Sequence, residues 1–138
     1  MKDLDWLVQH RFEALTRHEY DWVFAFGDDV SIVAGCLWRL VEDGRIRVTN
    51  LDEGQWFGLP APVDPVVEVS ARLTDAVIDG VELCAGTLDL RIRFDTGHIL
   101  ELIPESSGYE AWNITTGDQQ FIAIGGGELA VWGIGPSE

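Results

Sequence analysis

Apolar side chains near the N-terminus recur at intervals of three and four residues, which is the spacing of one helix face. Asp3 precedes them at the place where a helix cap is expected. The pattern therefore predicts an amphipathic helix over residues 3–16. Its apolar positions are Leu4, Leu7, Val8, Phe12 and Leu15.

From Trp22 onward, apolar positions alternate with polar ones, which is the period of a half-buried strand. Turns rich in Asp and Gly separate the alternating runs, as expected for hairpins. In the last run of this part, Ile46 and Val48 are expected to face the core. The predicted strands span residues 22–26, 31–41 and 45–49.

Residues 50–64 show no period and hold Asp, Gly and two prolines, so we expect a long loop with Trp56 and Phe57 in its middle. Asp64 followed by Pro65 is typical of a helix cap and first turn. A short central helix is therefore predicted after the loop. Its apolar face consists of Val66, Val69 and Leu73.

The rest of the chain consists of further alternating runs separated by turns. They are residues 77–83, 88–94, 99–103, 109–115, 120–124 and 129–132. The sequence predicts a single α+β domain over residues 1–138, since this length suits one core. An antiparallel β-sheet is expected to carry the N-terminal amphipathic helix and the short central helix on one face.

Two parts of the chain echo each other. Phe26 and its Gly-Asp turn are followed by Trp38, just as Phe94 and its turn are followed by Trp112. The sheet is therefore expected to have two meander-like halves. The spacing between Phe and Trp differs between the halves, and any meander of amphipathic strands gives some such echo. The sequence leaves open whether the halves are a duplication.

The charge balance narrows the classes of partner. There are 24 acidic residues against 9 basic ones, a formal net charge of −15. Nucleic-acid binding is not expected, because phosphate neutralisation needs clustered Lys and Arg. An acidic face that attracts a basic protein, such as a nuclease, is one interpretation, and an acidic protein with nothing to attract is the other. The strand-length apolar runs and the absence of a signal-peptide pattern favour a cytoplasmic protein with no membrane segment.

The sequence contains no motif typical of catalysis, metal binding or cofactor binding. His10, His18 and His98 are the available imidazoles, and each is expected at the surface rather than in a catalytic role. Cys36 and Cys84 lie far apart in apolar runs and are expected to be buried thiols. We therefore expect no catalytic residue, no metal ion and no cofactor.

A run of three glycines, Gly125-Gly126-Gly127, superficially resembles a phosphate-binding loop. A P-loop would continue into Lys and a helix, and neither follows here. The run predicts a turn into the last strand.

Trp56 differs from the other tryptophans. Most of those, including Trp132, fall in predicted strands, where they would fill a core, whereas Trp56 and its neighbour Phe57 fall in a predicted loop beside carboxylates. This composition is typical of an interface or ligand hot spot. The alternative is a loop folded back so that an aromatic ring plugs the end of the sheet. With a second candidate segment around Tyr109, the predicted binding residues are Asp52, Glu53, Gln55, Trp56, Tyr109, Glu110 and Trp112.

The chain resembles a family of small bacterial proteins of unknown function. The resemblance rests on the strand pair from Ile92 to Leu100, the Tyr-Glu-Ala-Trp strand ending at Trp112, and the Gly-Glu-x-Ala-Val-Trp strand ending at Trp132. Some relatives occur near toxin genes of bacterial competition systems, so the resemblance implies an immunity protein. It supplies no catalytic residues.

Three functions are compatible with these observations. The favoured one is a non-enzymatic binding protein, immunity-like or antitoxin-like, that presents an acidic face to a basic protein. The second is a small-ligand domain with an aromatic pocket lined by Trp56, Tyr109 and Trp112. The third and least favoured is an acid/base hydrolase that would use Glu110 with a carboxylate of the central loop. Homodimer formation through an exposed strand edge stays open.

Overall fold

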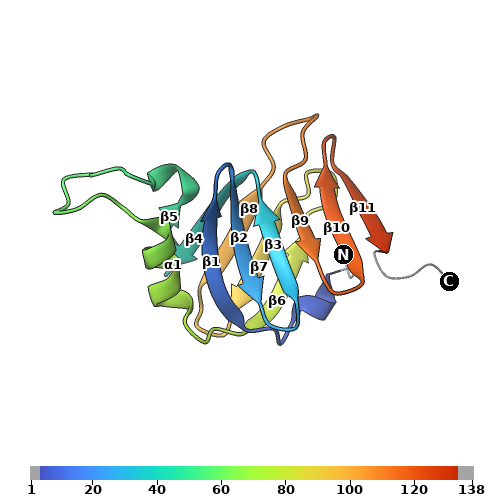
Figure 1. Cartoon of the computed structure of the whole chain (residues 1–138), viewed down its shortest axis with the longest axis horizontal. Coiled ribbons are helices and arrows are strands. Elements are labelled where there is room, and N and C mark those ends of the chain that lie inside the picture. Colours follow the sequence, from blue (N-terminus) through green and yellow to red (C-terminus); the bar gives the residue numbers. More distant parts are fainter. Residues whose placement is uncertain (1–3, 134–138) are drawn as a thin grey trace.

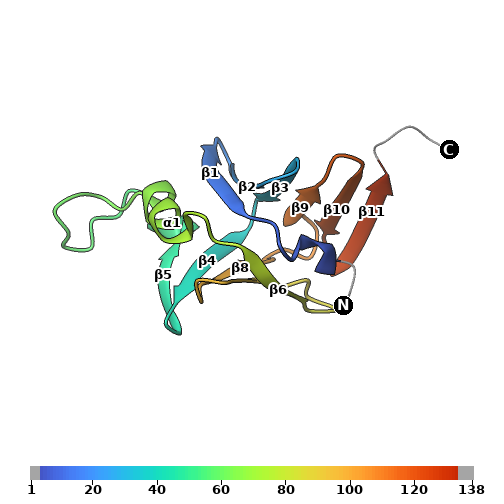
Figure 2. The same cartoon turned by 90° about the horizontal axis from the view of Figure 1, so that it is seen from below.

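The computed structural model describes residues 4–133, which form two antiparallel sheets facing each other, with one helix between their edges (Figures 1 and 2). The six-stranded sheet has the order β1-β2-β3-β9-β10-β11. Its strands are β1 (Phe12–His18), β2 (Asp21–Phe26), β3 (Val30–Ala34), β9 (Trp112–Thr115), β10 (Gln119–Ile124) and β11 (Glu128–Gly133).

The second sheet has five strands in the order β5-β4-β8-β7-β6. They are β4 (Leu37–Glu42), β5 (Arg45–Thr49), β6 (Ile78–Leu83), β7 (Leu90–Phe94) and β8 (Ile99–Ile103). The helix α1 (Pro65–Leu73) begins at the predicted Asp64 cap, whose side chain accepts from the Val66 amide. Two 3₁₀ turns complete the described elements, η1 (Asp5–Leu7) and η2 (Asn50–Asp52). The α+β class and the antiparallel pairing are confirmed.

The two halves of the chain have the same strand order. In the first half, the meander β1-β2-β3 lies in the six-stranded sheet, and the hairpin β4-β5 crosses to the other sheet. In the second half, β6-β7-β8 lies in the five-stranded sheet, and β9-β10 crosses back. Each sheet therefore combines the meander of one half with the hairpin of the other, and β11 is an additional strand.

The register repeats as well. Trp38 pairs with Leu102 across β4 and β8, and Trp112 pairs with Ala34 at the matching position of β9 and β3. A bulge follows Phe12 in β1, and a bulge follows Ile78 at the same place in β6. The echo seen in the sequence thus corresponds to a repeat of structure.

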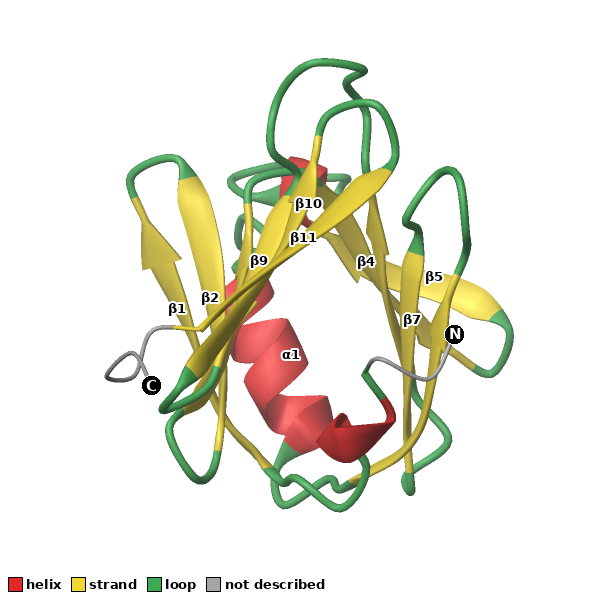
Figure 3. Ribbon diagram, turned by 90° about the vertical axis from the view of Figure 1, so that its right-hand side faces the viewer, coloured by secondary structure: helices red, strands yellow, loops and turns green. Residues whose placement is uncertain are grey.

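The N-terminal helix is not formed, and its place is taken by η1 and β1. η1 corresponds to the last turn of α1, because Leu7 and Leu73 are both fully buried and each accepts from the amide three residues later. Gln9 and Asp75 then both turn the chain at positive φ. α1 packs against β1 and β5, between the edges of the two sheets (Figure 3), whereas η1 packs against β6 on the opposite side of the molecule (Figure 1).

The bulge in β1 explains why the pattern resembled a helix. It adds one residue between Phe12 and Leu15, so both side chains face the core although they are three positions apart. Spacing by three is then read as helical periodicity. The prediction of a helix was wrong over residues 4–16 for this reason, and its predicted cap, Asp3, lies outside the described residues.

Other predictions need correction. The run 31–41 is broken at Gly35 and Cys36, where the chain leaves one sheet for the other. Ile46 is exposed, because a bulge pairs it with Val41 on the outer face of β4 while Val48 pairs with the buried Leu40.

Two residues expected inside lie outside. Cys84 is exposed at the start of the β6–β7 turn, whereas Cys36 is buried, and both thiols are free. Trp132 is exposed on β11, whereas the tryptophans of β2, β4 and β9 are buried. Among the described residues, no helix has the length and apolar character needed to cross a membrane.

The three glycines form the turn between β10 and β11, as predicted. Side chains are excluded there, because a Cβ on Gly125 would overlap with the backbone of Gly108, and one on Gly127 would overlap with the carbonyl of Gly86. The glycines therefore allow three connections to pack backbone to backbone at this end of the sheets.

Candidate functional site

One end of the two sheets combines carboxylates with exposed aromatic side chains. We call it the loop end; it consists of the connections 19–20, 35–36, 50–64, 84–89, 104–111 and 125–127, which lie at the upper end in Figure 1. These connections contain no lysine or arginine. Their carboxylates are Glu19, Asp52, Glu53, Asp64, Asp89, Glu105 and Glu110.

Four aromatic side chains of the loop end are exposed to solvent. Tyr20 is 83% exposed, Trp56 57%, Phe57 66% and Tyr109 82%. The connections at the opposite end also carry carboxylates but no aromatic residue. The two ends therefore differ in the side chains that usually supply binding energy. The carboxylates of the opposite end are Asp28, Asp29, Asp43, Asp75, Asp95 and Asp118.

The loop 50–64 projects from the edge of the sheets in a defined conformation (Figure 1). Its base is closed by hydrogen bonds, from the Gly54 amide to the Val63 carbonyl at 2.9 Å and from the Val63 amide to the Gln55 carbonyl at 2.8 Å. Asp52 completes a capping box with Thr49. The loop does not fold back over the end of the sheet, so the Trp56 side chain is exposed to solvent rather than buried in the core.

The tip of this loop is a tight turn. The Leu59 amide donates to the Trp56 carbonyl at 2.7 Å, and the two residues between them have positive φ, 45° for Phe57 and 74° for Gly58. A bulky residue with positive φ is unusual and strained. Because Phe57 is also exposed, neither packing nor backbone preference accounts for its presence.

A hollow of about 250 Å³ lies beneath the tip. It is lined by Phe57 and Leu59, and by Arg47 and Glu68 from β5 and α1. Glu53 pairs with Arg17 of β1 at 3.2 Å, which ties the start of the loop to the six-stranded sheet. The loop thus combines apolar side chains with an ion-paired base.

The second candidate segment is the connection between β8 and β9. The Ser106 hydroxyl accepts from the amides of Gly108 and Tyr109, which shapes the turn that displays the Tyr109 ring. Glu105 accepts from the Leu37 amide, and Glu110 accepts from the Asn113 side chain at 3.1 Å. These residues border a hollow of about 300 Å³ next to Cys36. Burial, and then the charge of Glu105, raise the pKa of the Cys36 thiol to about 12, so the thiol is un-ionised at neutral pH.

The structure brings the predicted site residues to one end of the molecule but not into one pocket. The residues of the 50–64 loop and those around Tyr109 line separate hollows. Trp112 is fully buried, with its indole N–H donating to the Leu88 carbonyl at 3.0 Å, so it is a core residue. Sequence reasoning missed Tyr20, although its place in a two-residue hairpin turn was a usable signal of exposure.

The arginines are distributed differently from the aromatics. They lie on the strands or α1, or beside the start of a strand, and most of them pair with carboxylates there. The paired arginines are Arg11, Arg17, Arg39, Arg47, Arg72, Arg91 and Arg93. No lysine or arginine follows Arg93. Of the loop-end carboxylates, Glu53 alone has an ion-pair partner within residues 4–133, which is Arg17. The arginines therefore compensate charge mainly on the sheets and α1, and most loop-end carboxylates stay without a cation beside them.

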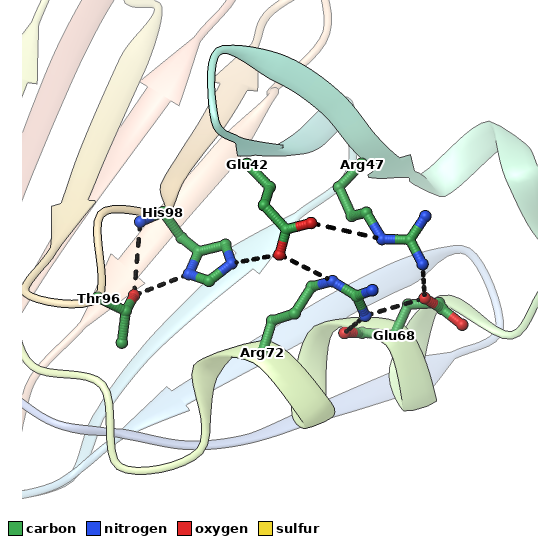
Figure 4. Close-up of polar contacts among 6 residues, drawn as sticks. All are labelled: Glu42, Arg47, Glu68, Arg72, Thr96 and His98. Carbon is green, nitrogen blue, oxygen red and sulfur yellow. Dashed lines mark hydrogen bonds and ion pairs between the residues drawn. The ribbon is translucent and has the colours of Figure 1, made fainter.

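A polar network at the opposite end is centred on Glu42 and His98 (Figure 4). Glu42 lies 2.9 Å from the His98 Nε2, and the other ring nitrogen of His98 lies 2.8 Å from the Thr96 hydroxyl. The hydrogen bond from His98, followed by the charges of neighbouring cations, lowers the pKa of the Glu42 carboxyl. His98 is thus half-buried and engaged, rather than a solvated surface histidine.

The same network fixes α1 to the five-stranded sheet. Arg72 of α1 lies 3.2 Å from Glu42, and it also pairs with Glu68 at 3.0 Å. Arg47 of β5 pairs with Glu68 at 3.0 Å from the other side. Every charged member has a partner within the network, so its evident role is to hold the helix in place. Within the described part of the chain, no cluster of side chains could hold a metal ion.

A family model described as a family of unknown function (DUF6188) matches residues 4–133. The chain belongs to this family. The match covers both structural halves and every connection of the loop end, so the DUF6188 domain comprises the whole described fold. The same comparisons matched no curated protein and no solved structure. The expectation of a family of unknown function is confirmed, and its description names no activity.

Proposed function

We propose that this protein is a non-catalytic binding protein whose loop end receives a basic protein partner. The observation that carries the proposal is the coincidence, at one end of the fold, of exposed aromatic side chains and carboxylates in connections that lack lysine and arginine. Trp and Tyr are enriched among the few residues that carry most of the binding energy in protein interfaces. Carboxylates around them favour partners of opposite charge and accelerate their association.

The conformation of the 50–64 loop supports this function. Its closed base and its tight tip hold Trp56 and Phe57 in place before a partner arrives. A preorganised surface loses less conformational entropy on binding than a flexible loop does. The strained backbone of Phe57 is the kind of feature that is retained at functional sites.

In the most specific form of the proposal, the partner is a basic toxin such as a nuclease, and the protein is its immunity protein. A nuclease must carry a basic surface, because it binds phosphates. An acidic end with protruding aromatic rings is suited to cover such a surface and exclude the nucleic acid. This role needs no catalytic group and no cofactor in the immunity protein.

Capture from a lysate of the source organism tests the proposal. The baits are the wild type, a Trp56→Ala/Tyr109→Ala variant, and a charge variant of each end. The loop-end charge variant carries Glu19→Gln, Glu105→Gln and Glu110→Gln, and the opposite-end variant carries Asp28→Asn, Asp29→Asn and Asp118→Asn. Both remove the same charge and keep the hydrogen-bonding side chains, so they differ only in location.

The proposal requires an identified basic protein that the wild type and the opposite-end variant retain and that both loop-end variants lose. A retained protein that binds all four baits equally would place the interface elsewhere. Circular dichroism of each bait shows that the folded state is kept.

A further inference from the structure

The last strand of the six-stranded sheet, β11, packs Leu129 against the core and leaves its other large apolar side chains exposed. Among residues 4–133, β11 pairs with β10 alone, and none of its own residues is buried. Val131 is 51% exposed and Trp132 59% exposed, although both are large apolar residues. β11 also has no counterpart in the first half of the repeat. A strand of this kind needs a partner to bury its apolar side chains.

Within the part of the chain that the structure describes, β11 is also the least protected of the four sheet edges. The edges β1 and β5 contact α1, and the edge β6 contacts η1. They carry charged side chains along their length, whereas β11 carries only Glu128, at its first position. Charged residues and covering helices are the usual means by which edge strands avoid pairing. The charged residues of the three protected edges are Glu13, Arg17, Arg45, Arg47, Asp79 and Glu82.

We propose that β11 pairs with β11 of a second copy, in antiparallel orientation, to form a homodimer with a continuous sheet. A two-fold axis perpendicular to the sheet relates the strands, as in the commonest class of homodimer. If the axis passes through Ala130, Glu128 of each copy lies opposite Trp132 of the other. If it passes through Val131, Glu128 lies beyond the residues that pair. No like charges face each other, and the strand is complementary to itself.

The uncharged edge favours a second copy over a basic partner, because it offers a basic segment no opposite charge. The proposed dimer also leaves both loop ends free. Since antiparallel pairing reverses the strand direction, the loop ends of the two copies point in opposite directions. Each copy could then receive its own partner, and the dimer does not depend on the proposed function.

The salt dependence distinguishes the two kinds of binding. Two chains with a formal charge of −15 each repel one another, and salt screens this repulsion. Dimerisation is therefore expected to tighten as salt is added. Binding of a basic protein at the loop end is expected to weaken under the same conditions.

Sedimentation equilibrium of the purified protein, over a range of concentrations and at low and high salt, tests the dimer. The variants are Val131→Lys on β11 and, as a control, Thr16→Lys on the protected edge β1, both at exposed strand positions. The wild type and Thr16→Lys are expected to approach twice the mass of one chain, while Val131→Lys stays monomeric. A wild type that is monomeric throughout, or a Val131→Lys variant that dimerises like the wild type, would overturn the proposal.

Amide hydrogen exchange gives a second readout that needs no variant. In the wild type, the amides of residues 128–133 should become protected as the concentration rises, while those of the β1 edge do not change. Exchange in 128–133 that is independent of concentration, in a sample that dimerises, would place the interface elsewhere.

Discussion

Phe26 and Phe94 stack on each other in the core, with their ring centroids 6.3 Å apart and their planes 18° from parallel. Each is the last residue of the second strand in its half, so the contact joins equivalent positions of the repeat. Around it, Arg11 and Val77, which also correspond, form a bridge between the segments that lead into β1 and β6. The two halves of the chain are therefore joined through equivalent residues, and each sheet contains strands from both halves.

Trp38 and Trp112 occupy matching positions but make different contacts. Both are fully buried, yet the Trp112 indole donates to the Leu88 carbonyl, whereas the Trp38 indole N–H has no hydrogen-bond partner among the described residues. The reason is that Leu88 belongs to the β6–β7 turn, and the corresponding turn between β1 and β2 is shorter. Trp112→Phe is expected to lower the free energy of unfolding by about 1–2 kcal/mol more than Trp38→Phe, because it leaves a buried carbonyl unpaired. Urea denaturation of the two variants measures the difference, and equal losses would contradict this assignment.

The glycine turn gives a second prediction. Gly127→Ala would place a methyl group against the Gly86 carbonyl at a residue with a φ of 82°. A loss of about 2–3 kcal/mol in the free energy of unfolding is expected, from overpacking and backbone strain together. Gly117→Ala is the control, since a Cβ there meets no atom within 4 Å. Thermal unfolding should show a large shift for the first variant and a small one for the second.

Phe57 provides a test of function against stability. Asn accepts the left-handed conformation far better than Phe does, so Phe57→Asn should stabilise the fold, by about 0.5–1 kcal/mol. The same substitution removes an exposed aromatic ring and should weaken partner binding. A Phe57→Asn variant that is more stable and binds the partner as well as the wild type would show that Phe57 contributes neither to stability nor to binding. Leu59→Asn is a useful comparison, because it removes apolar surface nearby without relieving strain at a positive φ.

The Glu42 network predicts a dependence on pH. The pKa of the Glu42 carboxyl is lowered in the folded protein from its ordinary value of 4.5. The stability that the ionised carboxylate contributes is therefore fully present above pH 4.5, and it is lost as the pH falls through the lowered pKa of the folded state. The difference in melting temperature between the wild type and Glu42→Gln should therefore be steady near pH 5 and shrink toward pH 3. A difference that stays constant over this range would mean that the carboxylate adds nothing through its charge.

The sequence predicted the parts of the fold in which local pattern and burial agree. Alternation identified β2, and Asp64 with Pro65 marked the start of α1. It failed where a bulge changed the spacing, as between Phe12 and Leu15, and where a strand lies at the edge of a sheet with no other described element over it, as at Trp132. Neither a bulge nor an uncovered edge has a signal in the local order of apolar residues.

The candidate site, too, was predicted from the sequence only in part. The segment before Tyr109, with two serines and a glycine, indicated its exposure, whereas the sequence left open whether Trp56 is exposed or plugs the end of the sheet. The structure has both rings exposed. Trp112 was predicted as a binding residue, although its place in a strand pattern favours the core, where the structure has it. Its indole donates to a carbonyl of the β6–β7 turn, more than twenty residues away in the chain, which no local pattern shows. The gathering of the connections at one end is likewise a property of the strand order.

The most direct test of the central claim is the affinity of the captured basic protein for the two charge variants, measured by titration calorimetry at two salt concentrations. We predict that the loop-end variant Glu19→Gln/Glu105→Gln/Glu110→Gln binds at least about tenfold more weakly than the wild type, a loss of about 1.4 kcal/mol. Its affinity should also depend less on salt, because three charges that attract the partner are gone. We predict near wild-type affinity for Asp28→Asn/Asp29→Asn/Asp118→Asn. Equal weakening of the two variants would contradict the claim, because net charge alone, and not the loop end, would then hold the partner.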